Sequence, residues 1–205
     1  MIDFYTAATS NGQRVAIALE ETALPYTVHK LNFQNGDQKK PEYLAINPAG
    51  MIPAIVDHDG PGGKPLSLSQ SGAIIMYLAE KSGKLLPSDA ARRAIARQWV
   101  MQACSDCAGA SSAIFLSNGM VPDKSPANVE FFENRLLRFF RDADARLSGR
   151  DFLADEISIA DVALYPIYAA RKTLADRAGD MPNLTRWGAA MAARPGIVKG
   201  LAASS

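Results

Sequence analysis

The chain has 205 residues, of which 48% are hydrophobic, and its 22 Lys and Arg against 21 Asp and Glu give a formal net charge of +1. This length suits one large domain or two small ones with a sizeable core. The balanced charge, without a basic run, argues against nucleic-acid binding. No apolar stretch reaches the roughly 18 residues that cross a bilayer, and residues 1–5 do not resemble a signal peptide, so we expect no membrane partner.

Cysteine is scarce, with only Cys104 and Cys107. Two cysteines cannot form a disulfide scaffold, which favours a reducing compartment and a cytoplasmic location. Their Cys-x-x-Cys spacing lies inside an expected helix, and a zinc site needs about four ligands. The only histidines, His29 and His58, are far away in sequence. We therefore expect two packed thiols and no metal, with a redox role for the pair as the alternative.

Strand and helix patterns alternate in the first 80 residues. In chain order we expect a strand at 2–5, a helix around 15–23, a strand at 26–31, a short helix at 41–46, strands at 52–57 and 66–68, and a helix at 71–82. Strands are recognised by β-rich or alternating runs, and helices by apolar residues three and four apart. The order βαβαββα predicts an α/β domain with one parallel strand pair and one hairpin.

Strand patterns nearly vanish after this region, and long helical patterns replace them. We expect a linker at 82–89, then helices at 91–113, 126–147, 159–177 and 184–193. The second half therefore predicts an all-α domain. The expected domains are 1–81 and 90–205.

Three motifs in fixed order carry a family resemblance. Residues 47–55 read Asn-Pro-x-Gly-x-Ile-Pro-Ala-Ile, residues 68–71 read Leu-Ser-Gln-Ser, and residues 152–161 read Phe-Leu-Ala-Asp-Glu-x-Ser-Ile-Ala-Asp. Together they resemble the glutathione S-transferase superfamily over nearly the whole chain. The resemblance implies a thioredoxin-like domain that binds glutathione as co-substrate, a helical domain that forms the electrophile pocket, a homodimer and a role in detoxification.

The first loop, Thr9-Ser10-Asn11-Gly12, resembles the bacterial nu class, whose members reduce disulfides with glutathione as well as conjugating it. Classes with a cysteine nucleophile carry it in this loop, and here there is none. The resemblance makes Thr9 and Asn11 the residues that stabilise the glutathione sulfur. Ser10 is a further catalytic candidate, although Ser10-x-x-Gln13 also fits a capping box. Tyr5 is either a catalytic phenol or, as we favour, a strand-end aromatic.

The remaining site residues would bind the rest of glutathione. The resemblance implies a cis Ile52–Pro53 bond, so that the Ile52 backbone pairs with the peptide-like ligand as an added strand. Gln70 and Ser71 lie where a strand gives way to a helix whose first N–H groups suit a carboxylate, although simple capping by Ser69 or Ser71 is the alternative. Gln38 matches a glutathione-contacting position of the nu class, although a solvated polar loop is the alternative.

Two readings of the function follow. The first is a transferase that uses the glutathione thiolate against electrophiles and also small disulfides, or against electrophiles alone. The second is a non-catalytic glutathione-binding or stress-regulatory protein, because a fold does not fix a function.

Overall fold

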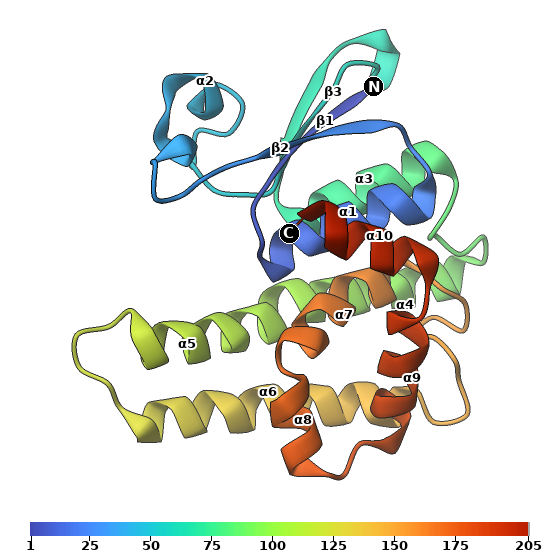
Figure 1. Ribbon diagram of the computed structural model, residues 1–205. Coiled ribbons are helices and arrows are strands. Elements are labelled where there is room, and N and C mark those ends of the chain that lie inside the picture. The colour runs from blue at the N-terminus through green and yellow to red at the C-terminus, as the bar shows by residue number, and fades with distance from the viewer. Residues whose placement is uncertain (205) are drawn as a thin grey trace. The chain divides into compact units, whose positions relative to one another are not determined.

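The computed structural model describes residues 1–204, which divide into two compact units (Figure 1). The first unit contains residues 1–86 and the C-terminal residues from 193, and the second contains residues 87–192. The expected domain limits of 1–81 and 90–205 stay a prediction. Within residues 1–204, no helix is long and apolar enough to cross a membrane.

The first unit has the predicted βαβαββα order and one added helix. Its elements are β1 (Ile2–Thr6), α1 (Ser10–Thr22), β2 (Tyr26–Lys30), α2 (Pro41–Leu44), β3 (Ala54–Asp57), β4 (Leu66–Ser69), α3 (Ser71–Ser82) and α10 (Pro195–Ser204). Short 3-10 turns occur at Asp37–Lys39 and Pro61–Gly63. The thioredoxin-like fold is therefore confirmed.

The four strands form one mixed sheet in the order β2-β1-β3-β4. β1 and β2 are parallel, whereas β3 is antiparallel to both β1 and β4. This arrangement confirms the predicted parallel pair and hairpin. Side chains alternate along β1, where Ile2, Phe4 and Thr6 are buried. In Figure 1, α1 and α3 lie side by side along one face of this sheet.

Helix α10 was not expected from the sequence, and it packs closely on α1 within the first unit. A Cβ built on Gly200 would lie 2.7 Å from the backbone N of Ile17, so the two backbones approach at a residue without a side chain. Just before α10, Arg194 donates two hydrogen bonds to the carboxylate of Glu21 on α1, at 3.0 and 2.8 Å.

All regular secondary structure of the second unit is helical. Its elements are α4 (Ala90–Met101), α5 (Ala108–Gly119), α6 (Pro126–Arg146), α7 (Ile159–Ala170), α8 (Lys172–Ala178) and α9 (Pro182–Ala192). The helix expected at 91–113 is interrupted by a π-helical segment, Gln102–Cys107, and the helix expected at 159–177 breaks at Arg171. A capping box of Ser158 and Asp161 begins α7.

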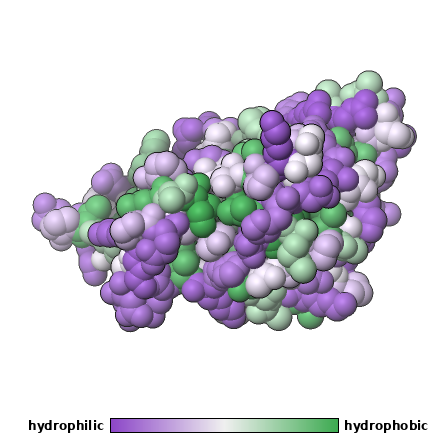
Figure 2. Space-filling view, turned by 90° about the horizontal axis from the view of Figure 1, so that it is seen from above, coloured by the Kyte–Doolittle hydropathy of each residue, from purple (hydrophilic) through white to green (hydrophobic). Residues whose placement is uncertain are grey.

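Hydrophilic residues cover most of the face in Figure 2, and hydrophobic residues emerge there in small groups.

The core of the second unit is rich in aromatic rings. Trp187 makes edge contacts with Tyr165 and Tyr168, with ring centroids 6.0 and 5.7 Å apart.

Candidate functional site

Strand register brings the predicted site residues to one end of the sheet. Tyr5 of β1 pairs with Ala54, and Ala54 pairs with Ser69 of β4. The end of β1, the start of β3 and the end of β4 therefore lie side by side. Consequently the loop after β1, the Ile52–Pro53 bond before β3 and Gln70 after β4 gather at this end.

The first turn of α1 carries Thr9, Ser10 and Asn11. Thr9 is the N-cap, and its hydroxyl oxygen accepts a hydrogen bond from the Gly12 N–H at 3.1 Å. This bond uses the oxygen as acceptor and leaves the hydroxyl proton to donate elsewhere. Ser10 is already the first helical residue, so the capping box predicted for it is wrong: Thr9, one residue earlier, has the extended backbone of an N-cap.

Arg14 joins the first turn of α1 to α3. It is almost completely buried, with 1% of its surface exposed. Its Nη1 donates to Asn11 Oδ1 at 2.5 Å and to Ser71 Oγ at 3.1 Å. Sequence reasoning missed this residue because arginine is usually exposed. The available signal was its position three and four residues before the apolar Ile17 and Ala18, on one helix face.

Gln70 and Ser71 mark the passage from β4 into α3. Gln70 has a positive φ of 73° with a ψ of 111°, and its side chain makes no capping hydrogen bond. Ser71 is the first residue of α3 and is buried. The N-cap position is therefore Gln70, not Ser69 or Ser71 as the capping alternative required. The first N–H groups of α3 form an electropositive helix end.

The Ile52–Pro53 peptide bond is cis, as the family resemblance implied. The carbonyl of the preceding Met51 accepts hydrogen bonds from the Tyr43 hydroxyl and the Asn47 side-chain amide, both at 2.6 Å. Tyr43 and Asn47 are buried, so they fix the backbone that enters the cis bond. Their roles were not predicted, although Asn47 begins the first quoted motif.

Gln38 lies in the 3-10 turn that precedes α2, close to the backbone of Gly50. A Cβ built on Gly50 would lie 3.0 Å from the Gln38 carbonyl oxygen, and the φ of Gly50 is +60°, so glycine is needed there. The side-chain Oε1 of Gln38 is buried and has no hydrogen-bond partner among residues 1–204. Such an oxygen is an acceptor available to a polar ligand.

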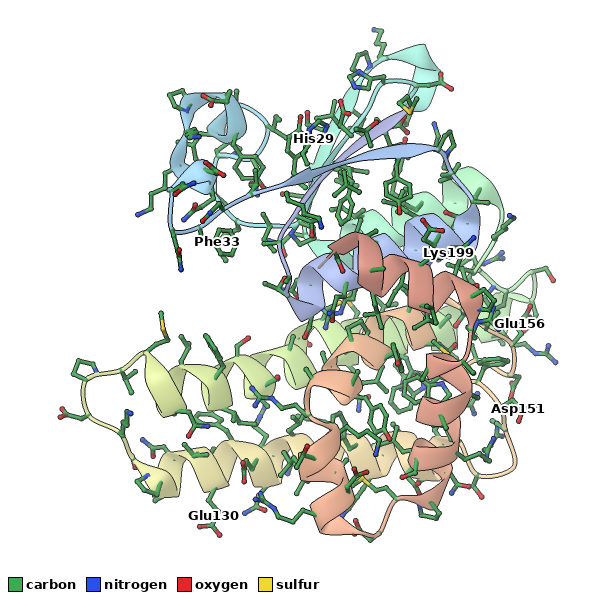
Figure 3. The ribbon with its side chains drawn as sticks, viewed as in Figure 1. His29, Phe33, Glu130, Asp151, Glu156 and Lys199 are labelled. Carbon is green, nitrogen blue, oxygen red and sulfur yellow. The ribbon has the colours of Figure 1, made fainter. Side chains whose placement is uncertain are left out.

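Tyr5 packs among aromatic rings at the outer face of the sheet. Its ring stacks on His29, with centroids 4.6 Å apart, and lies 5.7 Å from the ring of Tyr43. Figure 3 labels His29 on β2, with Phe33 in the loop that follows. Burial raises the pKa of the Tyr5 phenol. These contacts fit the strand-end aromatic that we favoured.

The two cysteines lie in the second unit, in the π-helical segment. Cys107 is buried, Cys104 is partly buried, and no disulfide joins them. Within the described residues, no group of three or more His, Cys, Asp or Glu side chains is placed to hold a metal ion.

Taken together, the site offers donors and acceptors along one sheet end, and residues 1–86 contain no cysteine. Hydroxyl and amide donors lie at the start of α1, a second helix N-terminus lies at α3, and a strand start with a cis bond lies near both. Such a site can hold an extended, peptide-like anion and lower the pKa of a thiol presented to it. The thiol must come from the ligand.

Two domain families match this chain. The glutathione S-transferase N-terminal domain matches residues 9–81, and the glutathione S-transferase C-terminal domain matches residues 113–203.

Two curated relatives from Escherichia coli (strain K12) are named as oxidoreductases. The disulfide-bond oxidoreductase YfcG is 38% identical over 168 residues, covering 81% of this chain and 78% of its own. The disulfide-bond oxidoreductase YghU is 31% identical over 219 residues, covering 97% of this chain and 73% of its own.

Solved structures are similar over almost the whole chain. A glutathione transferase from Burkholderia graminis, with two glutathione molecules per subunit, has a TM-score of 0.91 and 37% identity, covering 98% of this chain and 87% of its own. A glutathione transferase from Pseudomonas putida, with one glutathione disulfide per subunit, has a TM-score of 0.90 and 35% identity, covering 98% and 90%.

Proposed function

Because this chain belongs to the glutathione S-transferase family, we propose that it binds glutathione in its first unit and uses the glutathione thiolate against electrophiles and small disulfides. The observation that carries this proposal is the Arg14 bridge, since one buried nitrogen reaches both Asn11 and Ser71. The residue proposed for the sulfur and the residue proposed for the γ-glutamyl end therefore belong to one connected site.

Each part of glutathione has a proposed partner. Thr9 and Asn11 stabilise the sulfur, with Ser10 as a further donor in the same turn. The Ile52 backbone before Pro53 pairs with the cysteinyl unit. Gln70 and Ser71 hold the γ-glutamyl amine and carboxylate. The buried Oε1 of Gln38, which lacks a partner among residues 1–204, accepts a hydrogen bond from the amide N–H of the glycyl unit.

The protein acts by position and electrostatics. A free thiol is mostly protonated at neutral pH, and donors aimed at the sulfur favour its thiolate. In conjugation, the thiolate attacks an electrophilic carbon, and the leaving group departs with the bonding electrons. In disulfide reduction, it attacks one sulfur of the disulfide and releases the other as a thiolate. A second glutathione then attacks the mixed disulfide, which gives glutathione disulfide and the second thiol.

Of the two proposed reactions, the similarity to relatives favours disulfide reduction over conjugation. Both curated relatives described above are named disulfide-bond oxidoreductases, and the Pseudomonas putida structure contains glutathione disulfide. The first unit of this chain has no cysteine, and in this proposal glutathione supplies both reacting thiols. We further propose that the second unit forms the pocket for the electrophile or disulfide.

Calorimetric titration tests this proposal with glutathione disulfide and with reduced glutathione. We expect the disulfide to bind at least as tightly as the reduced form, because a reductase site must hold two glutathione units. Binding of reduced glutathione alone, together with turnover of an aryl halide, would leave conjugation as the sole activity. Binding without turnover of either substrate would indicate a glutathione-binding protein, and no binding of either form would overturn the proposal.

We also propose a homodimer in the cytoplasm. Large apolar side chains are exposed on the second unit, where a partner copy would cover them: Met101, Phe115, Leu116, Met120, Val121 and Phe131. Reliance on reduced glutathione suits a reducing compartment. Light scattering should give twice the chain mass of 22.0 kDa, and a mass of one chain would contradict the dimer.

A further inference from the structure

We propose that Arg14 is a positioning residue that sets which atoms Asn11 and Ser71 present to glutathione. This inference rests on the proposed function, and it concerns a side chain that is not itself expected to touch the ligand. Arg14 is 1% exposed, whereas Asn11 lies at the surface. The buried guanidinium therefore acts on the ligand only through the side chains of Asn11 and Ser71.

The chemistry of the guanidinium fixes the orientation of the Asn11 amide. Arginine has five N–H donors and no acceptor, so the Asn11 atom that faces Nη1 has to be the carbonyl oxygen. The Asn11 NH₂ group is then directed away from Arg14. An asparagine without this neighbour could present either oxygen or nitrogen to a sulfur, and only the nitrogen stabilises a thiolate.

The same nitrogen imposes a direction on the Ser71 hydroxyl. Ser71 Oγ accepts from Arg14 Nη1 at 3.1 Å, so its single proton cannot point along that line. The hydroxyl is left to donate its proton elsewhere, which is the role a bound carboxylate requires. Nη1 carries two hydrogens, enough for one bond to each acceptor. Arg14 thus makes both residues donors and couples the two ends of the site.

Substitution of Arg14 by methionine and by lysine tests this inference. In Arg14→Met we expect the glutathione dissociation constant to rise about tenfold and the pKa of the bound thiol, followed by thiolate absorbance, to rise by about one unit. Arg14→Lys keeps a charged donor and should restore most of both values. The matched control is Arg194→Met, which breaks the Arg–Glu21 pair on the same helix and should change neither.

Two further measurements keep the test decisive. In the ligand-free protein, the Asn11 side-chain amide signals in a nitrogen-15 spectrum should shift and broaden in Arg14→Met but not in Arg194→Met. If the wild type binds no glutathione, the proposed function fails, yet these signals still show whether Arg14 orients Asn11. If Arg14→Met does not fold, a double-mutant cycle of Asn11→Ala and Ser71→Ala replaces it, and we expect non-additive effects on binding.

Three results would overturn the inference. The first is that Arg14→Met has the same glutathione dissociation constant and the same pKa of the bound thiol as the wild type. The second is that the Asn11 amide signals do not change in that variant. The third, for the replacement experiment, is additivity in the double-mutant cycle. A loss of stability alone, equal in Arg14→Met and Arg194→Met, would reduce Arg14 to a structural residue.

Discussion

The indole N–H of Trp187 donates to the carboxylate of Asp161 at 3.0 Å, and both side chains are fully buried. The same carboxylate accepts from the backbone N–H groups of Leu153 and Ser158, at 3.1 and 3.0 Å, and from the Ser158 hydroxyl at 3.2 Å. One side chain therefore ties the loop before α7, the first turn of α7 and helix α9 together. This role is one of folding in the second unit.

Replacing Asp161 by asparagine should destabilise the protein by about 3 kcal/mol. Each carboxylate oxygen faces two donors, so the NH₂ group of asparagine would confront N–H or O–H groups wherever it pointed. Urea unfolding measures the loss. The control is Asp151→Asn, because Asp151 is exposed and pairs only at the surface with Arg186, so we expect a change within about 0.5 kcal/mol. Equal stability of the two variants would contradict this assignment.

Asp161 also predicts a pH dependence. Burial raises the pKa of Asp161 from 3.8 to about 6, although its four hydrogen bonds act in the opposite direction. The folded carboxyl thus binds its proton more tightly than the unfolded one. Its contribution to stability is full below about pH 4 and is lost as the pH rises through about 6. The unfolding free energy of the wild type, minus that of Asp161→Asn, should fall by about 3 kcal/mol over this interval. A flat difference would argue against the raised pKa.

Gly12→Ala should destabilise the first unit by about 2 kcal/mol. A Cβ at residue 12 would lie 2.2 Å from Thr6 Oγ1 and 2.6 Å from the Ala7 carbonyl oxygen, and Thr6 is fully buried. Gly109→Ala is the matched control, since that helical glycine has nothing within 4 Å of its Cβ position. Alanine there should stabilise by about 0.5–1 kcal/mol. In thermal unfolding, the melting temperature should fall in Gly12→Ala and rise in Gly109→Ala. An unchanged melting temperature in Gly12→Ala would contradict the close contact between residue 12 and Thr6.

Local patterns predicted the first unit well because its strands and helices are short, periodic and separated by turns. Helix α3 begins and ends at the predicted residues, Ser71 and Ser82. Helix α10 escaped prediction because its burial depends on Gly200 fitting against Ile17, a contact between distant parts of the chain. Arg14 was missed because arginine is usually exposed, and its partner Ser71 lies 57 residues away. Helical periodicity can place a residue on the buried face, but it does not identify a partner in a distant part of the chain.

Removal of both cysteines, as Cys104→Ser with Cys107→Ala, should leave glutathione-dependent disulfide reduction at its wild-type rate. Both residues lie in the second unit, and the proposed chemistry takes its thiols from glutathione alone. The small loss of packing at buried Cys107 should appear as a lower melting temperature of a few degrees. The assay follows reduction of a small disulfide. Loss of reductase activity with retained glutathione binding would instead support a redox role for the cysteine pair.

Thr9→Ala should lower turnover more than it weakens glutathione binding. The Thr9 hydroxyl accepts from the Gly12 N–H, so its proton is available to the glutathione sulfur, an interaction that gains strength as the thiolate forms. We expect kcat to fall about tenfold to a hundredfold, the pKa of the bound thiol to rise, and stability to fall by about 1 kcal/mol through loss of the N-cap. Thr9→Ser keeps both the cap and the donor and should retain most activity. Because cap loss alone predicts no change in thiol pKa, a Thr9→Ala variant with the wild-type pKa and kcat would remove Thr9 from the chemistry and leave it only as the N-cap of α1.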